Sequence, residues 1–424
     1  MALLASMALS APSRAAVVQP TATNLTSTAD RMVSYRHQEH SWITEDTHTQ
    51  LIYNRGVQES GDALQLASSI DGVTWVPKFS FAGTDHTSTS DSHYKNGVLS
   101  VVYSGTERDI RFATLRYDAD TRGWQPTGDT QIVRPATKGL AASNPTLVED
   151  DQGNVWVVYL HQVFNSSVDE AKTQLRLLVR AKGSTSWIDT NVKFGGTGIN
   201  PLEAPKRSAR LVRTPTGLGV VYSVEGAIYW QQRSTTGGFQ EAWSPRSTMV
   251  AGTSGQTDTD PYASHFSLAT DGDGFMHLVY TDGGVAYYRR YNAQPDVLAW
   301  SSQAIPLSKD IGAAYPQVSW LGGKRLAVVF DAHPAGKLSK LFVYQSDSRG
   351  AKDSFKCTSL LVHPNPQDSS EGISFLHMRS EMPSVATGGS VPLVMQYEQT
   401  LADAVSYKAY AYRFSASSTE GCAN

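Results

Sequence analysis

The sequence has few cysteines, no long apolar run, no basic cluster and no helical periodicity, and each of these absences argues against a class of protein. Its 424 residues include only two cysteines, and no run approaches eighteen apolar residues, so no membrane span is expected. The net charge is -3 and no basic cluster stands out, so neither nucleic acid nor an anionic membrane is an expected partner. No stretch has a convincing helical period, which disfavours a parallel α/β fold.

The N-terminus predicts an exported protein. Residues 1–15 have the short apolar core of a signal peptide and end on Ser13–Arg14–Ala15, a small-x-small cleavage site. The expected location is therefore extracellular or periplasmic. In such a compartment Cys357 and Cys422 are predicted to pair and to tether the tail, residues 416–424. Asn24-Leu-Thr26 fits the glycosylation sequon, which matters only in a eukaryotic host.

What the sequence does contain is a repeat. A short strand that begins near His265 is followed by the turn Asp271–Gly274, an apolar strand that ends on Tyr280, and Trp300 further on. Similar stretches recur along the chain, and such self-similarity decides the fold before other features are considered. The apolar strands end on Tyr53, Tyr103, Tyr159, Tyr222, Tyr280 and Phe330. The later aromatic residues, 49 to 63 positions apart, are Trp75, Trp124, Trp187, Trp243, Trp300 and Phe355.

The repeat predicts an all-β, seven-bladed β-propeller that forms one domain over residues 16–415. Each unit holds about four short strands with turn signals between them, which is typical of a propeller blade. The seventh unit has only three strands before the chain ends, so its fourth strand is expected from the N-terminus, within residues 16–30. Two packed β-sandwiches are the alternative, but they would not need so regular an aromatic series.

One turn gives the chain a resemblance to a known group. Ser69-Ile-Asp-Gly-Val-Thr-Trp75 resembles the Asp-box turn, one residue short. The chain after residue 30 is therefore similar to the secreted Asp-box propellers, which include sialidases, polysaccharide lyases acting on uronate-containing glycans, and lectin-like modules. The resemblance implies that Asp71 caps a hairpin between the third and fourth strands and that Trp75 packs between blades. It concerns architecture and selects none of these activities.

The predicted architecture also predicts where a ligand binds. The first strand of each blade lines the central channel, so the starts of these strands ring the channel mouth, where ligands usually bind. Polar residues are solvated at such a mouth in any case, but here they differ from blade to blade, which favours one asymmetric site over a repeated lectin pocket. The predicted ring comprises Gln38 to His40, Ser88, Asn144, Arg207 or Ser208, His265, Tyr315, and Glu381 or Met382.

The second unit departs from the pattern of the others. Its expected inner strand, Thr84 to Tyr94, is polar where the other units are apolar. Departures from the local sequence pattern are expected at functional sites. A solvated Ser/Thr-rich loop would have the same polar composition, so it remains an alternative. His86 or His93 is a candidate base, with Asp85 or Asp91 orienting the imidazole.

A uronate lyase needs a group that neutralises the substrate carboxylate, a base for the proton alpha to it, and an acid for the leaving oxygen. The ring supplies all three types, with Asn144 as a further substrate contact. The candidates are Arg207 and Arg210 for the carboxylate, His86, His93 or His265 for the base, and Tyr94 or Tyr315 for the acid.

We therefore interpret the sequence as an exported, monomeric polysaccharide lyase that cleaves next to a uronic acid of a poly- or oligosaccharide. A non-catalytic glycan-binding or adhesion module and an exo-glycosidase remain alternatives. A sialidase is less favoured, because the nearest N-terminal arginines, Arg31 and Arg36, stand in a different context from its arginine triad. No cofactor is required. A structural cation such as calcium in the channel stays open, although Asp271–Gly274 is more simply a hairpin turn.

Overall fold

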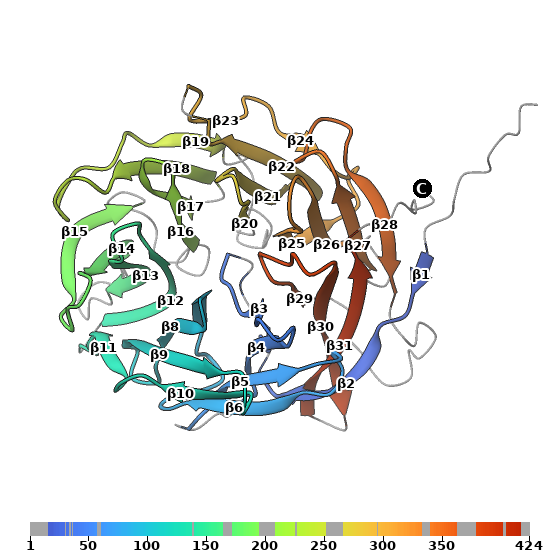
Figure 1. The fold of residues 1–424 in the computed structure, drawn as a ribbon, viewed down its shortest axis with the longest axis horizontal. Coiled ribbons are helices and arrows are strands. Elements are labelled where there is room, and N and C mark those ends of the chain that lie inside the picture. The colour runs from blue at the N-terminus through green and yellow to red at the C-terminus, as the bar shows by residue number, and fades with distance from the viewer. Residues whose placement is uncertain are drawn as a thin grey trace, which may run out of the picture.

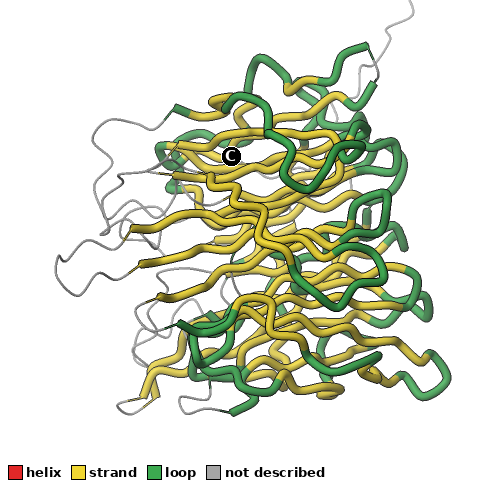
Figure 2. The backbone as a smooth tube through the Cα atoms, turned by 90° about the vertical axis from the view of Figure 1, so that its left-hand side faces the viewer, coloured by secondary structure: helices red, strands yellow, loops and turns green. Residues whose placement is uncertain are grey.

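The computed structural model describes residues 16–29, 31–33, 35, 37–56, 61–137, 140–163, 172–194, 208–224, 227–251, 266–294, 296–332, 340–362, 379–401 and 404–416. Within these ranges every regular element is a β-strand, as Figure 2 shows from the side. The described part of the chain contains no helix long and apolar enough to cross a membrane. Residues 1–15, His265, Arg207 and Cys422 lie outside the described residues.

The strands form seven sheets arranged in a ring, which confirms the predicted seven-bladed propeller (Figure 1). Blade one comprises β3 (Ser41–Ile43), β4 (Thr49–Asn54), β5 (Leu64–Ser69) and β6 (Val76–Phe81). Blade two comprises β7 (Ser90–Lys95), β8 (Val98–Ser104), β9 (Ile110–Asp118), β10 (Gly123–Pro126) and β11 (Gln131–Arg134). Blade three comprises β12 (Leu140–Glu149), β13 (Val155–Val163), β14 (Lys172–Arg180) and β15 (Ile188–Phe194).

Four further blades complete the ring. Blade four comprises β16 (Ser208–Thr214), β17 (Gly217–Val224), β18 (Ala227–Ser234) and β19 (Ser247–Val250). Blade five comprises β20 (Phe266–Thr270), β21 (Met276–Asp282), β22 (Val285–Asn292), β23 (Ala299–Trp300) and β24 (Ile305–Pro306). Blade six comprises β25 (Ala313–Trp320), β26 (Leu326–Ala332), β27 (Lys340–Ser346) and β28 (Lys356–Leu361), with β1 (Ala16–Val18) at its edge. Blade seven comprises β29 (Arg379–Glu381), β30 (Ser390–Leu401), β31 (Ala404–Ser415) and β2 (Thr21–Ser27).

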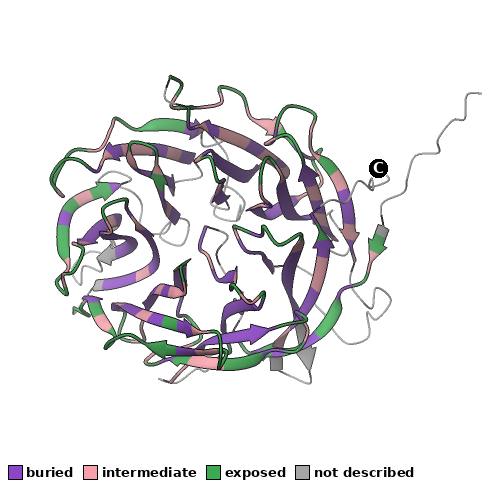
Figure 3. Ribbon diagram, in the orientation of Figure 1, coloured by how far each residue is buried: buried purple, intermediate pink, exposed green. Residues whose placement is uncertain are grey.

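The core lies between neighbouring blades. Each blade presents one sheet face to the blade before it and the other to the blade after it, so the second strands, such as β26, are buried along their whole length (Figure 3). Between blades two and three, for example, Val102 and Phe112 pack against Val157. The outermost strands, such as β6, are largely exposed. Burial of apolar side chains between blades is the main force that closes the ring.

An N-terminal strand completes the last blade, as predicted. β2 pairs antiparallel with β31 and becomes the fourth strand of blade seven. The Asn24 amide fastens this strand to blade one, because its Nδ2 donates to the Trp75 carbonyl at 2.8 Å and its Oδ1 accepts from the Trp75 N–H at 2.8 Å. β1 pairs parallel with β28 and adds a fifth strand to blade six.

The turn that suggested the Asp-box resemblance joins β5 and β6, the third and fourth strands of blade one. The Asp71 carboxylate accepts from the N–H groups of Val73 at 2.8 Å and Thr74 at 2.7 Å. These hydrogen bonds, that of Thr74 first, lower the pKa of Asp71 to about 2. Trp75 is buried with Leu25 of blade seven. The capping role of Asp71 and the packing of Trp75 between blades are therefore present in this turn.

Two hairpin details refine the expectations. The inner strand of blade two begins at Ser90, not at Thr84, because Asp85 to Ser88 form a turn closed by the Ser88 N–H on the Asp85 carbonyl at 3.0 Å. Asp271 caps the hairpin between β20 and β21, where its Oδ1 accepts from the N–H groups of Asp273 and Phe275, both at 2.9 Å. The described ranges hold no group of three or more His, Cys, Asp or Glu side chains arranged to bind a metal.

Candidate active site

A cavity of about 730 Å³ lies where the inner strands of blades one to five approach one another at the channel. Its walls come from the far ends of these strands, for example Ile43 of β3, Thr214 of β16 and Thr270 of β20. Ser384 and Val385, which follow β29 of blade seven, complete the lining. The predicted site was at the strand starts, whereas most of the described lining, apart from Glu39 just before β3, lies toward the opposite ends of the same strands.

Asp91 of β7 joins four blades at the wall of this cavity. Its side chain is fully buried and forms an ion pair with Arg210 of β16. Its Oδ1 also accepts from the Glu39 N–H at 2.6 Å, and its Oδ2 accepts from the Leu147 N–H at 2.8 Å. A buried carboxylate of this kind is stable only when its lone pairs are matched, as they are here. Asp91 therefore fixes the positions of Glu39 and Arg210.

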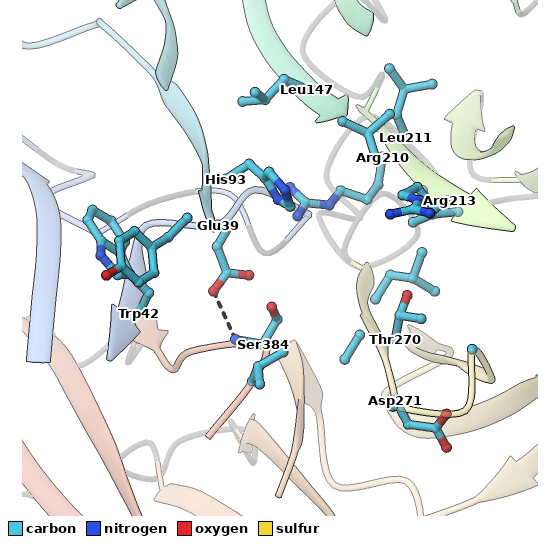
Figure 4. A pocket seen from close by; sticks show the side chains of 18 of the residues that line it. Glu39, Trp42, His93, Leu147, Arg210, Leu211, Arg213, Thr270, Asp271 and Ser384 are labelled. Atoms are coloured by element: carbon cyan, nitrogen blue, oxygen red, sulfur yellow. Dashed lines mark hydrogen bonds between the residues drawn. The ribbon is translucent and has the colours of Figure 1, made fainter. Parts of the chain in front are cut away.

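Glu39 presents a carboxyl group to the cavity (Figure 4). Its Oε1 accepts from the Ser384 N–H at 2.9 Å. Burial raises the pKa of Glu39 to about 7, while the Arg210 guanidinium opposes the rise and Glu381 adds to it. Near neutral pH a much larger fraction of Glu39 is therefore protonated than of an ordinary glutamate, which is almost fully ionised there.

His93 lies two residues beyond Asp91 on β7 and also lines the cavity. Figure 4 shows His93 and Arg210 directed into the same part of the cavity. Burial lowers the pKa of His93, and Glu149 opposes the change only in part. The imidazole is therefore neutral at neutral pH, which is the state that a general base requires.

Two further residues give the cavity a phenol and a cation. Tyr94 donates a hydrogen bond to Glu45, and burial together with that bond raises its pKa. Arg213 of β16 is exposed and lines the cavity wall across from Trp42 in Figure 4. Among the residues that the structure describes, no carboxylate forms an ion pair with Arg213.

A second polar cluster stands at the starts of the inner strands. The Glu381 carboxylate, which is 1% exposed, accepts from the His40 N–H at 3.1 Å and from Gln317 Nε2 at 3.2 Å. Gln38 Nε2 donates to the Pro145 carbonyl at 2.8 Å and so links blade one with blade three. Gln38, His40 and Glu381, all from the predicted ring, are therefore buried, and their hydrogen bonds connect neighbouring blades.

The structure brings together three of the eight residues predicted for catalysis and substrate binding. His93, Tyr94 and Arg210 line the cavity. His86 lies in the turn before β7 and is exposed to solvent away from the cavity wall. His265 and Arg207 lie outside the described residues, so their roles stay predictions.

Asn144 and Tyr315 instead occupy equivalent places in blades three and six. Both are buried, both have a positive φ (48° and 50°) and both precede a proline. Each lies in a bulge of its inner strand, where the register shifts between Ser143 and Thr146 or between Ala314 and Gln317. Such bulges bend a strand locally, so the role of these two residues is structural. Neither residue lines the cavity.

The sequence reasoning missed Arg213 and Ser384, and it placed Glu39 in the ring without assigning it a role. Glu39 precedes β3, Arg213 lies near the end of β16, Ser384 follows β29, and all three line the cavity. The polarity of the stretch around Asp91 was the available signal, because one buried charge on an inner strand requires partners on neighbouring blades.

No protein-family model and no curated protein sequence matches the chain. Among solved structures, it is similar to a polysaccharide lyase, an ulvan lyase bound to -[GlcA(1-4)Rha3S]-, with a TM-score of 0.53 and 11% identity over 94% of this chain and 96% of that chain. It is also similar to a candidate 6-phosphogluconolactonase from Bacteroides uniformis, with a TM-score of 0.50 and 12% identity over 84% of this chain and 92% of that chain. These likenesses show the fold alone, because the two neighbours share it and their names give different activities, a polysaccharide lyase and a lactonase.

Proposed function

We propose that the protein is an exported polysaccharide lyase that cleaves a glycan by β-elimination next to a uronic acid. One observation carries the proposal: His93, a partly buried histidine whose pKa is lowered by burial, shares a cavity with two arginines, Arg210 and Arg213. The fold of the ulvan lyase neighbour supports the same class of substrate.

The roles follow from the chemistry of each group. Arg213 is exposed in the cavity, so its guanidinium is available to bind the substrate carboxylate with two parallel hydrogen bonds. Arg210 keeps its ion pair with Asp91 and adds positive potential nearby. Neutralising the carboxylate makes the proton alpha to it more acidic, and His93 removes that proton.

The proposal is tested with uronate-containing polysaccharides. Cleavage by β-elimination leaves a conjugated, unsaturated uronate at the new end, which absorbs ultraviolet light. We expect wild-type protein to generate this absorbance, and His93→Gln to lower kcat by about a hundredfold or more, the usual scale for loss of a general base. His86→Gln is the matched control, because His86 lies in an exposed turn.

Two other outcomes contradict the proposal. New reducing ends without ultraviolet absorbance would identify a glycoside hydrolase. Binding on a glycan array without cleavage of any bound glycan would identify a non-catalytic module.

A further inference from the structure

The elimination leaves one role without an evident residue. When the bond to the leaving sugar breaks, its oxygen needs a proton. The sequence suggested Tyr94 or Tyr315 for this step. Tyr94 already donates to Glu45 and its raised pKa makes it a poor acid, whereas Tyr315 is buried in the bulge of β25 and does not line the cavity.

Glu39 is held in place from both sides. Its N–H donates to Asp91, and its carbonyl accepts from the Ser92 N–H at 3.0 Å and from the Ser92 hydroxyl at 2.8 Å. Asp91, Ser92 and the base His93 are consecutive on β7. The backbone of Glu39 is thus locked to the strand that carries His93, while the Ser384 N–H orients its carboxyl group from blade seven.

The charges that face Glu39 suit a group that gives up a proton during the reaction. Arg210 approaches from β16, Glu381 from β29, and Asp91 and His93 from β7. Burial and Glu381 favour the protonated form before the reaction, and these causes raise the pKa of Glu39 to about 7. Arg210 stabilises the carboxylate that remains after the proton has left.

We infer that Glu39 is the proton donor to the leaving oxygen of the elimination, an inference that rests on the proposed lyase function. His93 takes the proton alpha to the carboxylate, and the electron pair of that C–H bond forms the new C=C double bond. The bond between the adjacent carbon and the leaving oxygen breaks, its electron pair stays on the oxygen, and the Glu39 proton neutralises that oxygen. The site is left with a protonated His93 and an ionised Glu39, and exchange of one proton with water restores both.

A leaving-group experiment tests this role. Glu39→Gln keeps the shape of the side chain but cannot donate an acidic proton. We expect it to lower kcat about a hundredfold on the polysaccharide, whose leaving group is a sugar alcohol. On a uronate that carries a phenoxy group on the carbon beta to its carboxylate, the departing phenolate needs no proton, so we expect the loss to be at most a few-fold. Glu107→Gln, at an exposed glutamate in the turn between β8 and β9 that does not line the cavity, is the control and retains wild-type rates on both substrates.

The outcomes separate the two proposals. An equal loss on both substrates, or no loss on either, overturns the role of Glu39 and leaves the lyase function standing. If the wild type forms no unsaturated product from any uronate substrate, the lyase function and this role both fail. Should Glu39→Gln not fold, Glu39→Asp, which keeps an acidic proton but shortens its reach, is expected to slow polysaccharide cleavage more than cleavage of the phenolate substrate; equal slowing would contradict the role.

Discussion

At the scale of single residues, the geometry of the cavity depends most on Asp91. Its carboxylate accepts hydrogen bonds from the Glu39 and Leu147 N–H groups and forms an ion pair with the Arg210 guanidinium. The Asp91 side chain is fully buried, so water does not compete for these bonds at the carboxylate. A buried ion pair rarely makes a protein more stable than a well-packed apolar replacement of both partners would. Removal of the carboxylate alone, however, leaves the buried positive charge and the N–H groups without a partner. Asp91 therefore acts by positioning other residues.

We expect Asp91→Ala to lower the free energy of unfolding by roughly 3–5 kcal/mol, because it leaves the Arg210 charge without its partner in a largely buried place. Urea denaturation measures this difference. Asp120→Ala, in the exposed turn after β9, serves as the control and should change stability by less than about 0.5 kcal/mol. A loss no larger than that of the control would show that the network does not hold the cavity together.

The pH dependence of kcat/KM follows from two shifted groups. The lowered pKa of His93 places the acid limb below 6.5, the ordinary value for histidine, because the base acts only when it is neutral. The alkaline limb is expected near pH 7, where Glu39 loses the proton it must donate. The profile is therefore bell-shaped with a mildly acidic optimum, and Glu39→Gln should abolish the alkaline limb. A wild-type rate that still rises above pH 8 would contradict these assignments.

At the scale of the elements, the second unit shows what a polar strand means in this fold. The sequence predicted a functional inner strand from Thr84, and the structure begins it at Ser90, where Ser90, Asp91 and Ser92 are buried. An alternation of apolar and polar residues marks a strand only when the buried side chains are apolar. Here the buried side chains are polar and bond to groups of neighbouring blades, so the pattern does not locate the strand. For the same reason the sequence could not show that Asn144 and Tyr315 lie in bulges, because bulges depend on pairing with the adjacent strand.

The strand β2 provides a test of how the ring is fastened. Asn24→Ala removes both hydrogen bonds to the Trp75 main chain and is expected to lower the free energy of unfolding by about 1–3 kcal/mol. Thr26→Ala is the matched control, because Thr26 is exposed on the same strand and its substitution removes the same sequon. Thermal melting of both variants measures the effect, and equal melting temperatures would rule out a fastening role for Asn24.

At the scale of the whole molecule, the fold was largely predictable and the site was not. The six aromatic residues at regular spacing mark one blade each, and the three-stranded last unit gave both the seventh blade and the closure. The cavity arises only where strands from blades one to five and the segment after β29 approach one another. The distances between these strands depend on where each strand ends and on its bulges. A pattern within one stretch of sequence does not encode either.

The closure itself predicts an unequal response to truncation. Removal of residues 16–18 takes away only β1, an added edge strand of a blade that already has four, so the melting temperature should change little. Removal of residues 16–27 also takes away β2 and exposes the edge of β31, which should lower the melting temperature by many degrees and promote aggregation. The first truncation is the control for the second, and equal melting of both would contradict closure through β2.

The most direct test of the account is the ultraviolet absorbance of unsaturated uronate, followed while wild-type protein, His93→Gln and His86→Gln act on the same uronate-containing polysaccharides. The account predicts a steady rise with the wild type and with His86→Gln, and a rate about a hundredfold lower with His93→Gln. No rise with the wild type on any such glycan, or an undiminished rise with His93→Gln, would contradict a lyase site in this cavity.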